Sequence, residues 1–322
     1  MARTTVAILR GGRSSEYEHS LKTGAALLQA LPENRYDARD IFIDRSGMWH
    51  SRGMPAEPAR ALAQVDVALN ALHGGAGEDG TVQRILERTG VPYAGSRPMP
   101  SGTSLNKILA REVMENAGVR VPRGEAFSMR DGTTADMARR VFAEFAPPYV
   151  VKPPMEGSSI GIIIATAIIE LPDAIGDILD AYGTALVEEF VTGEEATVGI
   201  IENFRTEELY ALPPAQIVLP AAYRYLHHDV ITEGTMSYAV PSPFEYGDKQ
   251  KIIDAARAAH RALGLSHFSN VDIILTRRGP VVLEVNATPM LHNKSPFHHM
   301  LESVGSSVRE FAEHAISLAR HD

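Results

Sequence analysis

The sequence contains no cysteine. A disulfide framework and a thiolate metal site are therefore excluded, and the chain is expected to work in the cytoplasm, where disulfides are rare. Long apolar runs are also lacking. The start MARTTVAILRGG has no extended hydrophobic region of the kind found in signal peptides, and no segment approaches the length of a membrane span. We therefore expect no association with membranes.

Lysine is scarce in this chain. Of the 31 lysine and arginine residues, only those at positions 22, 107, 152, 249, 251 and 294 are lysines. Because arginine supplies most of the positive charge, a lysine at a strand end or helix start suggests a site that needs a compact point charge. The net charge of −9 argues against nucleic-acid binding, which requires a concentrated basic face.

A length of 322 residues with 44% hydrophobic content predicts two or three domains. In residues 1–98, apolar strands alternate with helices, which predicts a parallel sheet that binds ligands at its carboxyl edge. Residues 99–191 carry helical periodicity over 104–118 and 133–146, followed by strands. Residues 192–322 add further strands, a hairpin and a C-terminal helix. The predicted fold class is α/β, with boundaries near 98 and 191.

Several connecting segments can also be predicted. Residues 91–102, VPYAGSRPMPSG, are expected to form a connector, and residues 209–219 a single strand. The polar stretch 220–237 has no periodicity and is expected to be irregular, as a lid over a site would be.

The segment VVLEVNATPM is a buried strand interrupted by Glu284 and Asn286. A three-residue hairpin loop over 277–279 would place Asp272 directly opposite Glu284. Opposed like charges destabilise a sheet, so we expect a cation between them. Alternation puts Asn286 on the same face, and these oxygen ligands suit magnesium. An ordinary solvent-facing strand is the alternative, which the surrounding hydrophobicity disfavours.

The segment VVKPPMEGSSIG supplies groups that could bind phosphate. Lys152 ends a buried strand, and the loop with Gly157, Ser158, Ser159 and Gly161 follows it. Backbone N–H groups and hydroxyls of such a loop can close over a triphosphate. A plain surface turn would also explain the glycines and serines, although not the lysine. The spacing of a P-loop is absent.

Four motifs in this order resemble the ATP-grasp superfamily, and within it the D-alanine–D-alanine ligase family. They are GGRSSEYEHS, LHGGAGEDG, VVKPPMEGSSIG and DIILTRRGPVVLEVNATP, and the resemblance covers almost the whole chain. It implies an N-terminal parallel-sheet domain, with ATP held between central and C-terminal α+β domains. The implied reaction joins two small amino acids through an acyl phosphate. ATP, two magnesium ions replaceable by manganese, and a homodimer are also implied.

The resemblance assigns a role to each matching residue. ATP binding is expected at Lys107, Lys152, Gly157, Ser159, Glu188, Phe190, Val191 and Glu195. Magnesium is expected at Asp272, Glu284 and Asn286. Catalytic positions around the reacting groups are Glu16, His73, Ser158 and Asn270. Substrate contacts are expected from Met290, Lys294, Ser295 and His227.

Two departures mark the chain as a divergent member. Such ligases usually have an arginine where this chain has Asn270, and a glycine where it has Met290; both positions belong to groups that stabilise an oxyanion. In the lid, His227 or His228 replaces the usual Lys-Tyr pair and resembles the histidine of ligases that make D-alanyl-D-lactate, unless the pair is simply solvated. A dipeptide ligase is the leading hypothesis. A depsipeptide ligase and a nucleotide-binding protein that has lost catalysis remain as alternatives.

Overall fold

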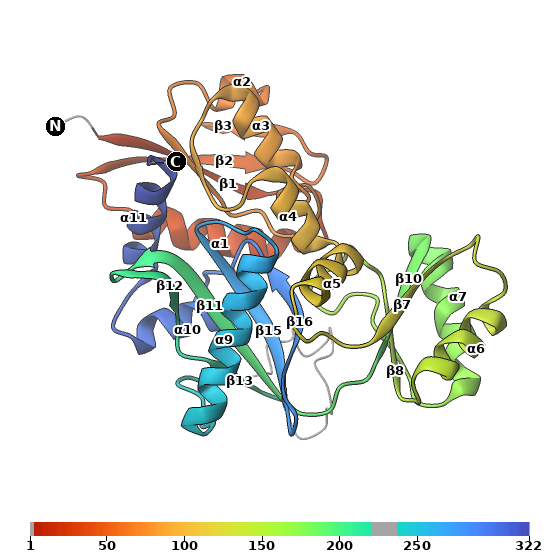
Figure 1. Cartoon of the computed structure of the whole chain (residues 1–322). Helices are drawn as coiled ribbons and strands as arrows, with labels where there is room; N and C mark the ends of the chain where they lie inside the picture. Colours follow the sequence, from red (N-terminus) through yellow and green to blue (C-terminus); the bar gives the residue numbers. More distant parts are fainter. Residues whose placement is uncertain (1–2, 220–236, 322) are drawn as a thin grey trace.

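The computed structural model describes residues 3–219 and 237–321, and three sheets organise them (Figure 1). The first sheet has the order β4-β3-β2-β1-β5-β6. Its central strand β1 pairs in parallel with β2 and β5, which confirms the predicted parallel sheet. Residues 6–9 of β1 are fully buried, as expected for a strand covered on both faces. The strands are β1 (Thr4–Gly11), β2 (Tyr36–Ile43), β3 (Trp49–Ser51), β4 (Met54–Pro55), β5 (Val67–Asn70) and β6 (Tyr93–Ala94).

Helices connect the strands of this first sheet. They are α1 (Tyr17–Ala30), α2 (Pro58–Ala61) and α3 (Thr81–Thr89), with a short 3₁₀ turn η1 (Gly75–Gly77) before α3. Helix α3 ends at Gly90, whose φ of 70° suits glycine and gives the expected helix stop.

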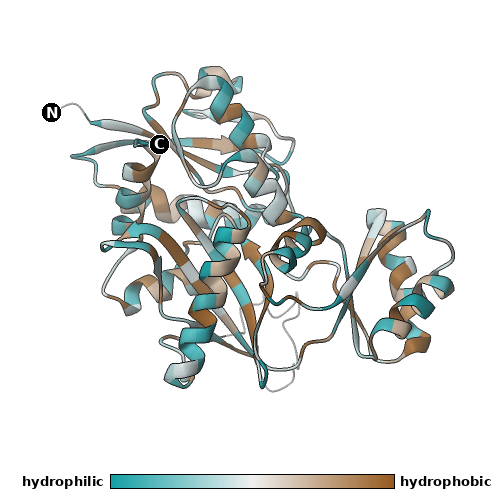
Figure 2. Ribbon diagram, viewed as in Figure 1, coloured by the Kyte–Doolittle hydropathy of each residue, from teal (hydrophilic) through white to brown (hydrophobic). Residues whose placement is uncertain are grey.

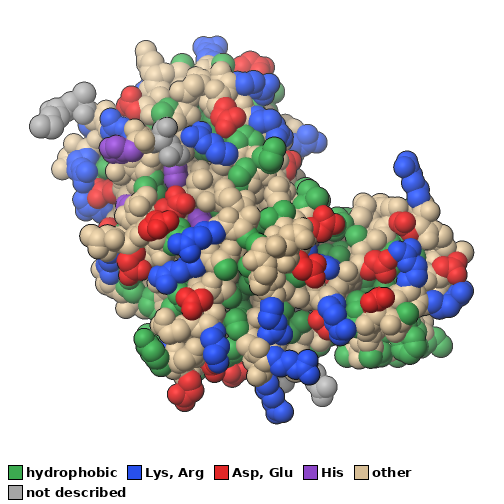
Figure 3. All heavy atoms as spheres, in the orientation of Figure 1, with side chains coloured by type: hydrophobic (Ala, Val, Ile, Leu, Met, Phe, Trp, Pro, Cys, Tyr) green, Lys and Arg blue, Asp and Glu red, His purple; other side chains and the backbone are tan. Residues whose placement is uncertain are grey.

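The second sheet is antiparallel, with the order β7-β10-β8-β9, and it projects to one side of the molecule (Figures 1 and 3). Two helices, α6 and α7, pack against each other and close its core. The elements are β7 (Gly124–Ser128), α6 (Thr134–Glu144), β8 (Tyr149–Lys152), β9 (Ile163–Ala165), η2 (Ile168–Glu170), α7 (Leu171–Tyr182) and β10 (Thr184–Glu189).

The third sheet has the order β14-β13-β11-β15-β16, with β12 paired to β11. Helix α9 packs on β16 and β15, and its solvent side is hydrophilic (Figure 2). The elements are β11 (Glu194–Phe204), β12 (Glu207–Ala211), β13 (Ala215–Val218), β14 (Ser237–Ala239), α9 (Tyr246–Ala262), β15 (Phe268–Thr276) and β16 (Gly279–Asn286). The single strand predicted over 209–219 is therefore wrong, because the chain leaves the sheet between β12 and β13, where Pro213 and Pro214 cannot donate to a strand ladder.

The predicted connector over 91–102 is also partly wrong. Helix α4 (Pro98–Leu105) begins there, and its prolines lie in the first turn, where no intrahelical N–H is needed. The helix predicted over 104–118 begins instead as α5 (Lys107–Asn116). Asn106 separates the two helices, since its side chain accepts hydrogen bonds from the first backbone N–H groups of α5. This cap fixes the position of Lys107.

The C-terminal helices α10 (Pro296–Ser303) and α11 (Val308–Ala319) bring the end of the chain back to the first sheet. Helix α11 contacts α1, β5 and β6, and one hydrophobic core joins these elements to the third sheet. In the same way, α4 and α5 pack on β16. In the described part of the chain, no helix combines the length and hydrophobicity needed to cross a membrane. The visible face mixes charges of both signs (Figure 3).

Candidate active site

The hairpin of β15 and β16 places two carboxylates face to face. Asp272 pairs directly with Glu284, which confirms the predicted pair. The predicted loop is wrong, however, because Thr276 pairs with Gly279 and the turn has two residues instead of three. A register shift after Asp272 makes up the difference of one residue.

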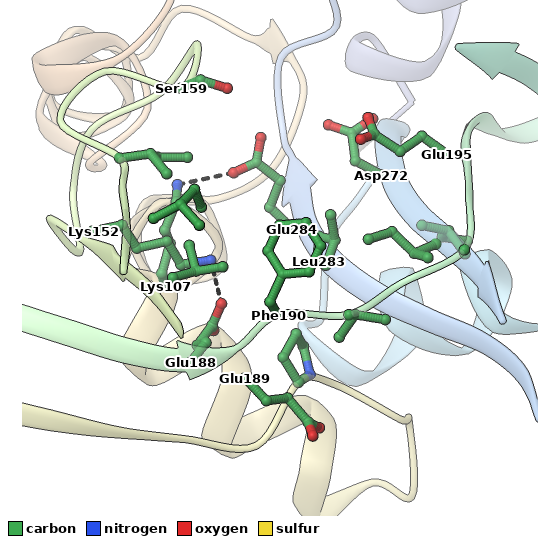
Figure 4. Close-up of a pocket in the computed structure, with 18 of the residues that line it drawn as sticks. Lys107, Lys152, Ser159, Glu188, Glu189, Phe190, Glu195, Asp272, Leu283 and Glu284 are labelled. Atoms are coloured by element: carbon green, nitrogen blue, oxygen red, sulfur yellow. Dashed lines mark ion pairs between the residues drawn. The ribbon is translucent and has the colours of Figure 1, made fainter. Parts of the chain in front are cut away.

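That register shift is a β-bulge with Leu283 as the surplus residue. Successive residues of a regular strand face opposite sides, whereas a bulge sets two residues of one strand against one of the other. Leu283 and Glu284 consequently line the same cavity (Figure 4). The bulge thus places an apolar side chain and a carboxylate next to each other.

The larger of two adjoining cavities, about 210 Å³, lies between the second and third sheets. Figure 4 shows both predicted phosphate-binding lysines in it, each in an ion pair. Lys107 Nζ lies 2.9 Å from Glu284 Oε2, and Lys152 Nζ lies 2.6 Å from Glu188 Oε2. The apolar wall includes Ile160, Ile162, Phe190, Val191, Ile274 and Leu283, and Glu189 and Glu195 lie at its polar parts. The cavity therefore has an apolar wall and two positively charged lysine side chains.

The oxygen ligands at one end of this cavity fit a hard cation. Desolvation, followed by repulsion from Glu284, raises the pKa of Asp272 to about 7. Desolvation acts to raise the pKa of Glu284, but the charge and hydrogen bond of Lys107, with smaller effects of Lys152 and Asn286, together outweigh it and lower that pKa. Asn286 Nδ2 donates to Asp272 Oδ2 at 3.2 Å. Two crowded carboxylates and an amide oxygen suit magnesium, which also takes phosphate oxygens and water.

Among residues 3–219 and 237–321, no three His, Cys, Asp or Glu side chains converge as metal ligands. Magnesium at this position would therefore depend on Asp272, Glu284 and the Asn286 amide oxygen, completed by ligand atoms and water.

The smaller cavity, about 140 Å³, lies beside the first and is lined by residues from all three predicted domains. Glu16, before α1, accepts a hydrogen bond of 2.5 Å from Ser158 Oγ. Burial raises the pKa of Glu16. His73 follows β5, and its Nε2 lies 2.8 Å from Thr23 Oγ1. Burial lowers the pKa of His73 to about 3, so its ring is neutral at pH 7.

Glycine at position 157 allows the serine loop to reach Glu16. A Cβ atom at Gly157 would lie 2.6 Å from Glu16 Oε2, which is closer than real contacts allow. The next two residues, Ser158 and Ser159, have φ values of 49° and 56°, a conformation that is uncommon outside glycine. Strained backbone of this kind concentrates at functional sites.

Seven lining residues of the smaller cavity were not predicted, and two of them, Glu78 and Tyr238, are ionisable. Glu78 accepts backbone hydrogen bonds from Gly74 at 2.7 Å and Thr288 at 3.2 Å. Burial, followed by repulsion from Glu16, raises the pKa of Glu78 to about 8. In the sequence, the only indication is the acidic pair Glu78 and Asp79 in LHGGAGEDG. The local sequence does not show which of the two carboxylates is buried.

The remaining predicted residues are dispersed. Asn270 and Met290 line the smaller cavity, whereas Gly157, Lys294 and Ser295 line neither cavity. Ser295 Oγ instead donates to the Met290 and His292 carbonyls and caps α10. His227 and its neighbour His228 lie outside the described residues.

The two cavities meet at a shared wall. Ser159, Ile217, Asp272 and Glu284 line both of them. A ligand in one cavity can therefore reach a ligand in the other across the opposed carboxylates.

Comparison with known proteins gives the family. Residues 113–317 match the family described as D-ala D-ala ligase C-terminus, and residues 52–96 match D-ala D-ala ligase N-terminus. A D-alanine–D-alanine ligase of Desulforudis audaxviator is 34% identical over 318 residues, which is 98% of each chain.

Solved structures agree on the fold. The VanG D-Ala:D-Ser ligase of Enterococcus faecalis superposes with a TM-score of 0.85 at 26% identity, covering 99% of this chain and all of that one. The D-alanine–D-alanine ligase of Bacillus anthracis complexed with ATP gives 0.82 at 24% identity, covering 99% and 98%. The chain belongs to the D-alanine–D-alanine ligase family, whose members are ATP-dependent ligases that join two amino acids.

Proposed function

We propose that this chain joins D-alanine, through its carboxylate, to the amine of a second small amino acid, with ATP bound in the larger cavity and both amino acids in the smaller one. The observation that carries this proposal is the shared wall at Asp272 and Glu284. Phosphoryl transfer requires the γ-phosphate and the attacking carboxylate to be positioned in line.

The larger cavity offers separate places for the parts of ATP. Phe190, Val191 and Leu283 provide apolar surface for the base, and Glu195 is in reach of the ribose. Lys107 and Lys152 provide compact positive charges for the phosphates. Both lysines pair with carboxylates, so phosphates would share or displace these partners.

Magnesium at Asp272, Glu284 and Asn286 would offset the charge of the phosphates. Two such ions would bind with ATP, and manganese could replace them.

The smaller cavity can orient the first amino acid. Glu16 and Ser158 would hold its ammonium group, which places its carboxylate toward the shared wall. Neutral His73 lines the cavity beside that carboxylate and adds no charge there, while its Nε2 is held by Thr23 Oγ1. The carboxylate attacks the γ-phosphate, ADP leaves, and the amine of the second amino acid then displaces phosphate from the acyl phosphate. Exclusion of water protects the acyl phosphate from hydrolysis.

Two assays test this reaction. With ATP, magnesium and D-alanine, hydroxylamine should trap the acyl phosphate as D-alanine hydroxamate. Phosphate release should require amino acid, and product masses over D- and L-amino acids and hydroxy acids identify both substrates. A product with D-lactate alone would support the depsipeptide alternative. ATP binding without hydroxamate or phosphate release would refute catalysis.

A matched pair of lysine variants tests the ATP assignment. Lys107→Ala should weaken ATP binding by about tenfold or more, since charge-assisted hydrogen bonds contribute about 1.5–3 kcal/mol. Lys294→Ala is the control, because Lys294 lines neither cavity. Equal ATP affinity of the two variants would contradict the assignment. A homodimer and a cytoplasmic location complete the proposal and rest on family resemblance.

A further inference from the structure

The smaller cavity is acidic. Its carboxyl side chains among the described residues are Glu16, Glu78, Asp272 and Glu284, and this part of the chain contributes no lysine or arginine to the lining. The pKa of Glu16 and that of Glu78 are both raised by burial. Asp272 and Glu284 lie at the shared wall (Figure 4). The positive charge of magnesium there would be balanced by the negative charge of the ATP phosphates. The rest of the cavity therefore disfavours a further negative charge.

Two hydroxyl groups at or near the cavity are already engaged as donors. Ser158 Oγ donates to Glu16, and Ser295 Oγ donates to two backbone carbonyls. Lys294 is exposed and lines neither cavity. A free carboxylate on the second amino acid would thus meet acidic side chains and, among the described lining residues, no lysine or arginine.

Asn270 adds a second, independent observation. Its Nδ2 donates to Thr197 Oγ1 at 2.8 Å and to Asp272 Oδ1 at 3.2 Å. Thr197 Oγ1 in turn donates to Asp272 Oδ1 at 2.6 Å. These contacts fix the orientation of the amide, because only Nδ2 can donate to the carboxylate.

The other atom of the same amide has no partner. Asn270 lines the smaller cavity and is 8% exposed. Its Oδ1 is buried without a hydrogen-bond partner among the described residues. Buried polar atoms are nearly always hydrogen-bonded. A ligand N–H would satisfy Oδ1, whereas a carboxylate, which has acceptors only, would not.

We propose that the second substrate is an amine whose neighbouring carboxyl group is an amide, as in an amino-acid amide or the amino end of a peptide, and that Asn270 Oδ1 accepts a hydrogen bond from that amide. This inference rests on the proposed function, since it names the second substrate of the same reaction. Unlike a carboxylate, an amide is uncharged, and it has at least one N–H group that can donate a hydrogen bond.

The bond changes are those of an acyl transfer. The acceptor enters the reaction as a free amine, after its ammonium group has lost a proton to solvent. Its nitrogen forms a C–N bond with the acyl carbon, and the C–O bond to phosphate breaks with its electron pair on phosphate. The second proton leaves with phosphate as hydrogen phosphate.

A competition experiment tests the inference on the complete protein. ATP, magnesium and D-alanine are supplied with equal concentrations of D-alanine and D-alaninamide as acceptors, and the products are separated by mass. The amide product should exceed the acid product by about tenfold or more, the effect of one charged contact. D-Alanyl-D-alanine in a parallel arm distinguishes a peptide acceptor from a single amino-acid amide.

D-Alanine methyl ester is the matched control substrate. It is uncharged and its amine is as weakly basic as that of the amide, but it offers no N–H to Asn270. The expected order of products is amide, then ester, then acid. Equal amide and ester products would overturn the role of Asn270 Oδ1, and an acid product equal to or above the amide product would overturn the whole inference.

Two variants of Asn270 should move the product ratio in opposite directions. Asn270→Arg adds a cation and should lower the amide-to-acid ratio at least tenfold, whereas Asn270→Asp adds negative charge and should raise it. Ratios that stay constant in both folded variants would contradict the inference. Hydroxylamine trapping in the natural protein distinguishes a failure of the acceptor assignment from a failure of the proposed function. Hydroxamate with acid preference overturns the acceptor alone, and absence of hydroxamate overturns the proposed function and the acceptor together.

Discussion

The buried ion pair of Lys152 and Glu188 offers a quantitative test of the site. The two side chains are 8% and 4% exposed and their charged atoms lie 2.6 Å apart. Lys152 ends β8 and Glu188 lies on the adjacent strand β10. Changing Lys152 to methionine keeps much of the side-chain volume but leaves the carboxylate of Glu188 without its partner.

The expected cost follows from burial. Removing one partner of a buried pair destabilises a protein by about 3–5 kcal/mol, because the remaining charge is uncompensated. Replacing both partners by neutral groups of similar volume is often close to neutral. Lys152→Met should therefore be strongly destabilising in the absence of ATP, and adding Glu188→Gln should recover most of the loss.

The adjacent residue provides a control. Glu189 pairs with Arg123 at 2.8 Å, but that arginine side chain is 63% exposed. Glu189→Gln should cost about 1 kcal/mol or less, as for surface pairs. Urea unfolding followed by circular dichroism measures all four proteins at pH 7 without ligand. A cost for Lys152→Met no larger than that for Glu189→Gln, or no recovery in the double variant, would refute the reasoning.

Three further predictions concern the carboxylates and the serine loop. Asp272→Asn and Glu284→Gln should each nearly abolish magnesium-dependent turnover while the circular dichroism spectrum is kept; near-normal turnover at saturating magnesium would contradict the metal site. Burial raises the pKa of Glu78 from 4.5 to about 8, so the folded protein keeps a proton that the unfolded chain releases. Its contribution to stability should fall by about 1.4 kcal/mol per pH unit as pH rises through that range. Glu78→Gln should remove this slope in unfolding experiments, and an unchanged slope would exclude Glu78 as its source. Gly157→Ala should displace Glu16 and raise the KM for the first amino acid more than that for ATP; an unchanged KM would show that the loop adapts.

The hairpin illustrates how far the sequence could predict the site. The opposed carboxylates were predicted from a three-residue loop and regular pairing, but the structure reaches the same pair through a two-residue turn and a bulge. Alternation of side chains cannot reveal such a bulge, because an apolar surplus residue such as Leu283 looks like part of the strand. The bulge thus restores the predicted pair of Asp272 and Glu284, although the turn is one residue shorter than predicted.

Other features escaped prediction because they depend on tertiary contacts. Sequence motifs identified Lys107 and Lys152 but could not show that each is paired with a carboxylate. Glu78 is recognisable only by its burial, which local sequence does not determine. Ser295 followed the family pattern in sequence, yet its hydroxyl caps a helix and lies outside both cavities. The elements themselves were largely predictable, since apolar periodicity reflects burial directly.

The bulge at Leu283 also has an evolutionary consequence. Arg277 and Arg278 form an exposed tip, where insertions and deletions are tolerated most easily. A relative with the same number of residues between Asp272 and Glu284 but a three-residue tip would lose the bulge and still keep Asp272 opposite Glu284. A change in tip length would then remove or add an apolar side chain beside Glu284. The apolar wall of the larger cavity would change, whereas the pair of carboxylates would not.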